Sequence, residues 1–204
     1  MKSADHEFTG AANALAADGW YVLPNLMVDV EIRALADECA AMHDAKLLLP
    51  ARTGATRKDA GLRGDSTHWF ANGAMSEPQQ MFTDRLDTLR LALSRTLTLG
   101  LVDCESHYAV YRPGASYARH RDCLRDNDAR VLSCVFYLNE HWQQADGGAL
   151  RLYLADGTAR DIYPHAGSLL LFLSTQFEHE VLPATRDRMS IASWMRQRRF
   201  DSLP

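Results

Sequence analysis

The chain has 204 residues, a length that fits one domain with a full hydrophobic core. Hydrophobic residues make up 47% and charged residues 24%, and the formal net charge is -4, so nothing attracts the chain generally to nucleic acid or anionic lipid. No apolar run approaches the length of a bilayer span, and the polar N-terminus has no apolar signal core behind it. We therefore expect a single domain over residues 1–204 that is cytoplasmic and binds neither nucleic acid nor membrane.

Helical patterns dominate the first hundred residues. A run of strong helix formers at residues 11–17 ends near Asp18-Gly19, and the β-rich segment 20–23 follows. Asp29 is a candidate N-cap for a second helix. Apolar stripes at helical spacing mark the second and third helices: Ile32, Leu35, Ala36, Cys39 and Met42, then Phe82, Leu86, Leu89, Leu93 and Leu97. These stripes predict helices that pack against a sheet.

Residues 47–73, between the second and third helices, have no apolar periodicity. Pro50, Gly54, Gly61 and Gly64 are interspersed with charged side chains there. The segment predicts a long loop, and long loops in compact domains are usually functional or disordered.

The character of the chain changes after Gly100. Short apolar or alternating runs are separated by Gly-containing turn signals, and the runs are residues 107–111, 131–138, 149–154, 168–173 and 188–194. Helices followed by many short strands predict an antiparallel sandwich or jelly roll supported by helices.

Three side chains in this second half form a candidate metal site. His120 and Asp122 have the i, i+2 spacing that places two side chains on one face of an extended segment. His179 follows a run dense enough in apolar residues to be a buried strand. Two imidazoles and one carboxylate are the facial ligand set of non-haem Fe(II) oxygenases. Taken alone, His120 and Asp122 are also compatible with a chance pair of surface residues. His179 alone is also compatible with a histidine buried in the core with its hydrogen bonds satisfied.

Arg188 begins an otherwise apolar strand nine residues after His179, and Ser190 shares its face. A guanidinium beside a hydroxyl can bind a carboxylate through charge-assisted hydrogen bonds. An unpaired buried arginine would be costly, so we expect an anionic co-substrate such as a 2-oxo acid here.

Four cysteines lack the paired spacing of a metal site and are expected to be free thiols: Cys39, Cys104, Cys123 and Cys134. Cys123 adjoins Asp122, which leaves a redox-sensitive thiol as an alternative for that residue.

The segment from Tyr111 to Asp122 resembles the active-site strand of the 2-oxoglutarate- and Fe(II)-dependent prolyl 4-hydroxylases of the EGL-nine type, which modify hypoxia-inducible factor, and of their bacterial relatives. The likeness continues through residues 137–142, 147–151 and 179–194, with weaker matches at 19–20, 42–44 and 62–69. It thus covers nearly the whole chain. The charged connection between Asp122 and Arg130 is closer to the bacterial branch than to the animal enzymes.

The resemblance implies an α+β fold, with a double-stranded β-helix (jelly roll, cupin-like) over residues 101–204 and supporting helices in residues 1–100. It implies that His120, Asp122 and His179 bind Fe(II), and that Arg188 and Tyr137 hold the distal carboxylate of 2-oxoglutarate. The other implied contacts are Tyr111, Leu150, Val181 and Trp194 around the co-substrate, and Arg63, Asp65 and Tyr117 around the substrate proline.

The activity that the resemblance implies is hydroxylation of a prolyl residue at C4, with O2 as co-substrate, succinate and CO2 as products, and ascorbate as a candidate reductant. The expected partner is a protein with a proline-containing loop, with a translation elongation factor as the leading candidate, and the expected state is a monomer. The chain ends at Pro204, where the animal enzymes have a substrate-holding C-terminal helix, so their substrate is not carried over. Oxygen sensing is a further implied role. The alternatives are a small-molecule or free-amino-acid dioxygenase and a non-catalytic, cupin-like metal-binding sensor.

Overall fold

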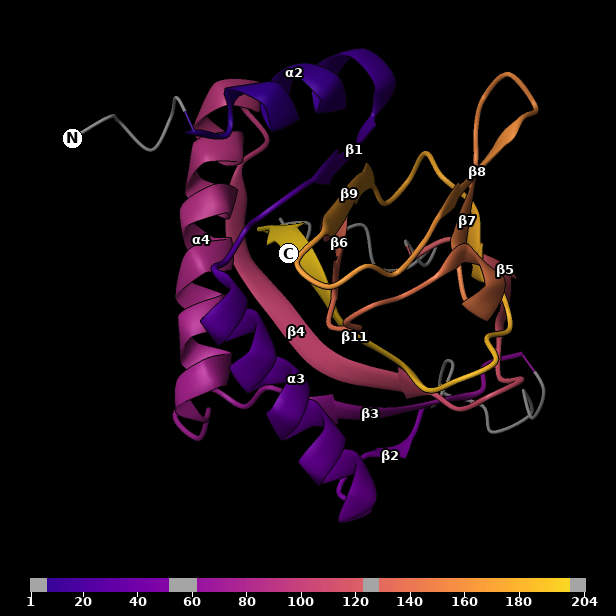
Figure 1. The fold of residues 1–204 in the computed structure, drawn as a ribbon. Coiled ribbons are helices and arrows are strands. Elements are labelled where there is room, and N and C mark those ends of the chain that lie inside the picture. Colours follow the sequence, from indigo (N-terminus) through magenta and orange to yellow (C-terminus); the bar gives the residue numbers. More distant parts are fainter. Residues whose placement is uncertain (1–6, 52–61, 123–128, 199–204) are drawn as a thin grey trace, which may run out of the picture.

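The computed structural model of the protein describes residues 7–51, 62–122 and 129–198 (Figure 1). Cys123 lies outside the described residues, as do residues 52–61 of the expected loop.

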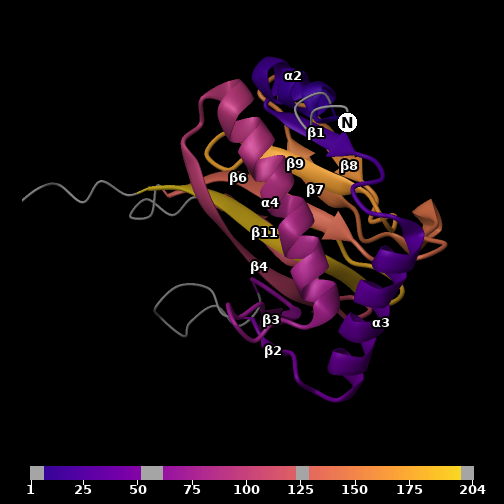
Figure 2. The ribbon, with the colours of Figure 1, turned by 90° about the vertical axis from the view of Figure 1, so that its left-hand side faces the viewer.

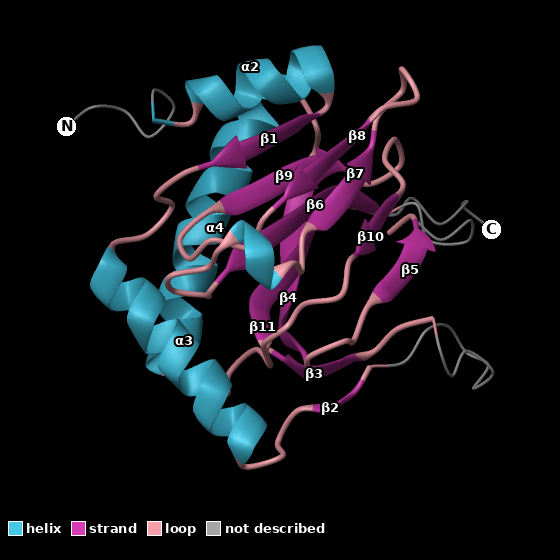
Figure 3. Ribbon diagram, turned by 45° about the vertical axis from the view of Figure 1, so that its right-hand side comes forward, coloured by secondary structure: helices cyan, strands magenta, loops and turns pink. Residues whose placement is uncertain are grey.

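The strands of the described residues form two antiparallel sheets (Figures 1 and 3). The larger sheet has seven strands in the order β1-β9-β6-β11-β4-β3-β2, and the smaller has four in the order β5-β10-β7-β8. Their bounds are β1 Trp20–Leu23, β2 Leu49–Pro50, β3 Asp65–Trp69, β4 Leu101–Tyr111, β5 Tyr117–His120, β6 Arg130–Tyr137, β7 Leu150–Tyr153, β8 Ala159–Ile162, β9 Leu169–Leu173, β10 His179–Val181 and β11 Arg188–Gln197.

The helices are α2 (Thr9–Asp18), α3 (Asp29–Asp44) and α4 (Glu77–Leu97), with a short 3-10 turn at Gln144–Asp146. The α4 helix runs along the outer face of the larger sheet, beside β4 (Figure 2). Its predicted stripe is buried there from Phe82 to Leu93, which confirms the expected packing of helix on sheet. None of the described helices is long and apolar enough to cross a membrane.

Alternation along the central strands gives the larger sheet two different faces. On β4, Tyr108 and Val110 belong to the hydrophobic core under the helices, whereas His107, Ala109 and Tyr111 line a cavity on the opposite face. β11 alternates in the same way. Ile191 and Met195 are in that core, whereas every second residue from Arg188 lines the cavity: Arg188, Ser190, Ala192 and Trp194.

A second core joins the two sheets on the cavity side. It contains Tyr137, Leu170 and Phe172 from the larger sheet together with Leu150 and Leu152 from the smaller one. The two sheets are therefore held face to face at one end by apolar contacts, and the cavity lies between them where those contacts stop.

The structure corrects three details of the expected elements. Two parts of the expected loop are strands: residues 65–69 form β3, paired in register with Tyr111 to His107 of β4, and residues 49–50 form β2, paired with β3. The N-cap of α3 is Val28, one residue before the expected Asp29. β8, between two of the predicted strands, was not anticipated.

Candidate metal centre

His120, Asp122 and His179 come together at the edge of the smaller sheet. His120 is the last residue of β5 and His179 the first of β10, and the two lie opposite each other in the register of this strand pair. The Nε2 atoms of His120 and His179 are 3.6 Å from Oδ1 and Oδ2 of Asp122, respectively. One ligand atom from each residue lies within 4.8 Å of the others, close enough to hold one ion. The two strands are neighbours in space although β6 to β9 separate them in the chain.

The protonation states in this cluster suit a divalent cation. The Nδ1–H of His120 donates to the Ala118 carbonyl at 2.8 Å, so the lone pair of a neutral ring is on Nε2, which faces Asp122. Burial lowers the pKa of His179 and keeps its imidazole neutral. Burial alone would raise the pKa of Asp122, but attraction to any proton that the two imidazoles hold, and the hydrogen bond donated by the Ser133 hydroxyl, keep this pKa well below its usual range. An ionised carboxylate with two neutral imidazoles is the state that binds Fe(II).

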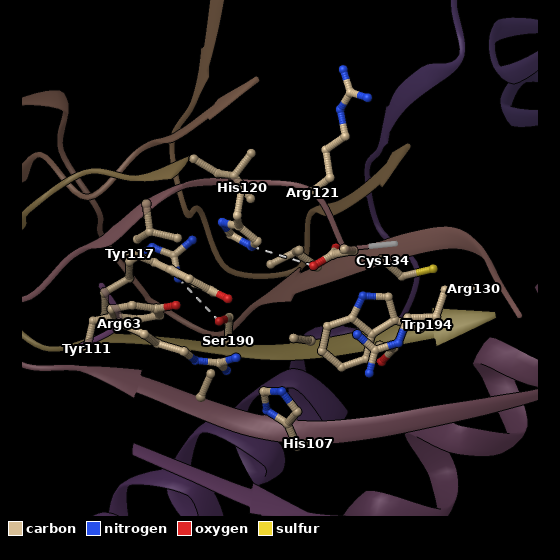
Figure 4. Close-up of a pocket in the computed structure, with 18 of the residues that line it drawn as sticks. Arg63, His107, Tyr111, Tyr117, His120, Arg121, Arg130, Cys134, Ser190 and Trp194 are labelled. Atoms are coloured by element: carbon tan, nitrogen blue, oxygen red, sulfur yellow. Dashed lines mark hydrogen bonds and ion pairs between the residues drawn. The ribbon is translucent and has the colours of Figure 1, made fainter. Parts of the chain in front are cut away.

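A cavity of about 450 Å³ extends from this cluster along the inner face of the larger sheet (Figure 4). Its floor is formed by alternate residues of β4 and β11, including the small side chains of Ala109 and Ala192. Leu150 and Val181 of the smaller sheet cover it, and Tyr111 and Trp194 also line it. All of the site residues expected from the sequence line this cavity except His179, Tyr137 and Asp65. Each of these three contacts a residue that lines the cavity, namely His120, Arg188 and Arg63, respectively.

Arg188 ends the cavity on one side and is only 1% exposed. Its Nε donates to the Gly148 carbonyl at 2.8 Å and its Nη1 to the Ser190 hydroxyl at 3.3 Å. Within the described part of the chain, neither its Nη2 nor the Tyr137 hydroxyl has a hydrogen-bond partner. Burial raises the pKa of Tyr137 to about 12, so this phenol is an O–H donor. A buried cation with free donors beside a neutral phenol is complementary to a carboxylate.

Arg63 and Asp65 bind each other. The guanidinium donates from Nε to Oδ1 at 2.6 Å and from Nη2 to Oδ2 at 2.9 Å, and the Asp65 side chain is fully buried. Arg63 lines the cavity, whereas Asp65 faces Arg63 from β3. Tyr117 lies between Arg63 and the metal cluster, with its ring stacked on that of His120.

His107 was not among the expected site residues, but it is completely buried and lines the cavity at the end away from Arg188. Its ring contacts that of Trp69 edge-on at 4.6 Å, and the Arg130 guanidinium lies 3.8 Å from the centre of the Trp194 ring nearby. Burial lowers the pKa of His107 to about 4. The available signal was alternation, because His107 and Tyr111 are four residues apart in one predicted strand and must share a face.

Comparisons with known proteins agree with this geometry. Residues 106–196 match the family model of the 2OG-Fe(II) oxygenase superfamily. A solved Pseudomonas putida prolyl-4-hydroxylase is 43% identical, covers 94% of this chain and 100% of its own, and superposes with a TM-score of 0.87. A Trichoplax adhaerens prolyl hydroxylase, solved with a hypoxia inducible factor peptide fragment, shares the fold with a TM-score of 0.81 at 22% identity over 96% of this chain and 91% of its own.

Curated animal proteins are similar over a shorter region. Egl nine homolog 1 of Rattus norvegicus is 29% identical over 180 residues, which are 78% of this chain and 50% of that protein. Prolyl hydroxylase EGLN3 of Mus musculus is 30% identical over 162 residues, 76% of this chain and 66% of that protein. The chain thus spans about half the length of the first of these relatives.

The fold, the donor set and the similarities confirm the expected double-stranded β-helix and the resemblance to the EGL-nine type. The oxygenases of this superfamily use Fe(II), 2-oxoglutarate and O2. The two-histidine, one-carboxylate cluster fits Fe(II), and the free donors of Arg188 and Tyr137 fit a carboxylate of the 2-oxo acid. The chain belongs to the 2-oxoglutarate- and Fe(II)-dependent oxygenases, within the group of the prolyl 4-hydroxylases.

Proposed function

We propose that the protein is a 2-oxoglutarate- and Fe(II)-dependent dioxygenase that hydroxylates a prolyl residue of a protein at C4, releasing succinate and CO2. The observation that carries the proposal is one cavity with a metal-ligand cluster on its wall and, at its end, a buried arginine whose Nη2 has no hydrogen-bond partner among the described residues. This distribution of charge matches a ligand that chelates a cation at one end and carries a carboxylate at the other.

Each side chain of the cavity has a role in this proposal. His120, Asp122 and His179 hold the iron, which when bound supplies the oxidative chemistry. Arg188 and Tyr137 hold the distal carboxylate of 2-oxoglutarate, with Ser190 beside the guanidinium. The contacts along the rest of the co-substrate come from Tyr111, Leu150, Val181 and Trp194. The apolar members of this set exclude water from the reacting groups, which limits side reactions.

The substrate enters beside Arg63 and Tyr117 in this proposal. Trp69 lines the same cavity and is 48% exposed, so a ring large enough to pack on a proline and its neighbours is available at the surface. The resemblance to the prolyl hydroxylases favours a polypeptide, and a proline-containing loop of a translation elongation factor is the candidate that the family resemblance supplies. A cytoplasmic, monomeric enzyme with a role in O2 sensing completes the proposal.

The test is turnover with defined peptides. The protein is incubated with Fe(II), 2-oxoglutarate, O2 and ascorbate, together with elongation-factor loop peptides or the same peptides with proline replaced by alanine. We expect succinate and a one-oxygen mass increase only with the proline peptides. Succinate formation with free amino acids but with no peptide would favour the small-molecule dioxygenase. Metal binding without any turnover, in extracts as well as with peptides, would favour the sensor.

A further inference from the structure

We propose that the Arg63–Asp65 ion pair positions the metal ligand His120, and that it acts through the ring of Tyr117. The proposal rests on the metal site of the proposed function, but it is independent of the substrate. It assigns to Arg63 and Asp65 a role in metal affinity, in addition to the contact with substrate that the family resemblance implies.

The Arg63–Asp65 ion pair is rigid. Both nitrogens that face Asp65 are engaged, at 2.6 and 2.9 Å, and the side chains are 15% and 0% exposed. Burial opposes the charge on Arg63, yet the hydrogen bond and the charge of Asp65 hold its pKa above the usual range, so the guanidinium stays charged. A bidentate pair of this kind fixes the plane of the guanidinium.

The ion pair is linked to Tyr117. Arg63 and Tyr117 face each other in an isolated antiparallel bridge, flanked by the hydrogen bonds Ala118 N to Leu62 O at 2.8 Å and Gly64 N to Ser116 O at 2.9 Å. The Arg63 Cζ lies 4.9 Å from the centre of the Tyr117 ring, within the range of a cation–π contact.

Tyr117 is in turn linked to the metal ligand. The Tyr117 and His120 rings are stacked, with centres 3.7 Å apart and planes inclined by 16° (Figure 4). Because this stack covers one face of Tyr117, the guanidinium lies over the other face. The His120 ring is thus restrained by the stack as well as by its hydrogen bond to the Ala118 carbonyl.

The backbone alone holds His120 weakly. β5 has four residues, forms the edge of the smaller sheet, and pairs with β10 at only two positions with an irregularity between them. Residues 62–64 contact β5 on its other side. An edge strand that ends on a metal ligand needs side-chain restraints to keep that ligand in place, and Arg63 and Tyr117 supply them for His120.

Charge balance explains why the arginine is paired. The negative face of an aromatic ring is attracted to a cation, and His120 becomes more positive when it coordinates a metal. An uncompensated guanidinium near the cluster would disfavour a divalent cation, whereas the fully buried Asp65 carboxylate neutralises it. Loss of Asp65 would therefore release the ring and also leave a repulsive charge beside the metal.

The experiment measures metal affinity without substrate. Mn(II) is titrated into the chelator-treated full chain by calorimetry, and electron paramagnetic resonance reports the geometry of the bound ion. Tyr117→Leu and Asp65→Asn should each weaken binding by about 10-fold or more, the range found when groups that orient metal ligands are removed. Tyr117→Phe keeps the ring and should retain wild-type affinity. The matched control is Asp103→Asn, which breaks the equally bidentate Arg196–Asp103 pair, with contacts of 2.8 and 2.9 Å, on β4 and β11.

A double variant tests whether the Arg63–Asp65 pair and the Tyr117 ring act on His120 in series. If Arg63–Asp65 acts through Tyr117, then Asp65→Asn combined with Tyr117→Leu should bind Mn(II) no more weakly than the weaker single variant. Additive losses would overturn the proposal, as would wild-type affinity in a folded Tyr117→Leu protein. An equal loss in Asp103→Asn would also overturn it, because the effect would then be general destabilisation. If Asp65→Asn fails to fold, Tyr117→Leu, at a half-buried position, still decides the question. A wild-type protein that binds no divalent metal would refute the proposed function itself, and this proposal with it.

Discussion

Replacing Arg188 with alanine removes the proposed anchor of 2-oxoglutarate. The side chain is 1% exposed, and two of its nitrogens are held by Gly148 and Ser190, which aims the third at the cavity. Truncating one partner of a buried, hydrogen-bonded charge pair costs about 2–5 kcal/mol. That range corresponds to roughly a 30-fold to several-thousand-fold rise in the concentration of 2-oxoglutarate that the protein requires. Arg188→Lys should fall between wild type and alanine, because an ammonium keeps the charge but not the fork of donors.

Calorimetric titration of 2-oxoglutarate into the Mn(II)-loaded protein, without O2, measures this affinity directly. The matched control is Arg186→Ala, two residues away, where the side chain is 43% exposed and the guanidinium packs on Trp142. The control should bind 2-oxoglutarate as wild type does. A folded Arg188→Ala protein with unchanged affinity would show that the carboxylate is held elsewhere, and the assignment of this end of the cavity would be wrong.

Four further variants test the same cavity. Asp122→Ala should leave the fold intact by circular dichroism and abolish measurable Mn(II) binding, because two imidazoles alone hold a divalent cation weakly. Tyr137→Phe should raise the KM for 2-oxoglutarate several-fold at most, since one neutral hydrogen bond contributes about 1 kcal/mol. Gly148→Ala should also weaken 2-oxoglutarate binding in calorimetry. The backbone φ is +66°, and a Cβ atom would lie 2.9 Å from Cβ of Ala184, so the backbone would shift together with the Gly148 carbonyl that holds Arg188. The pKa of His107 is about 4 in the folded protein, against an ordinary value of 6.5. As pH falls, the unfolded chain therefore binds this proton before the folded protein does. The metal-free wild type should lose up to about 3 kcal/mol of its free energy of unfolding between pH 6.5 and pH 4. His107→Gln should flatten this loss in urea unfolding followed from pH 7 to 4, and an unchanged slope would contradict the assigned pKa.

Short-range patterns were sufficient to predict the parts of the site that are two residues apart in the chain. His120 with Asp122, and Arg188 with Ser190, are i, i+2 pairs, which an extended backbone places on one face, although Asp122 lies two residues beyond the end of β5. The apolar stripe of α4 likewise predicts its own burial, because helical periodicity is a local property.

Other features depend on which strands become neighbours and could not be predicted from local patterns. β3 has the polar sequence Asp-Ser-Thr-His-Trp, and it is a strand because β4 pairs with it along its whole length. The contact of Ser133 with Asp122, at 2.7 Å, joins the larger sheet to the metal cluster of the smaller one. The Arg63–Asp65 pair is an i, i+2 pair in the sequence, but its link to His120 depends on the approach of residues 62–64 to β5.

In the proposed function, this cavity couples oxidation of 2-oxoglutarate to hydroxylation of a prolyl residue. The most direct test is one reaction under isotopically labelled O2, with the proline-containing peptide and its succinate product analysed by mass spectrometry. We expect one labelled oxygen atom in the hydroxyproline, at C4, and one in succinate, in equal amounts. An unlabelled hydroxyl group, or labelled succinate that never accompanies a hydroxylated proline in any peptide or cell-extract protein, would contradict it.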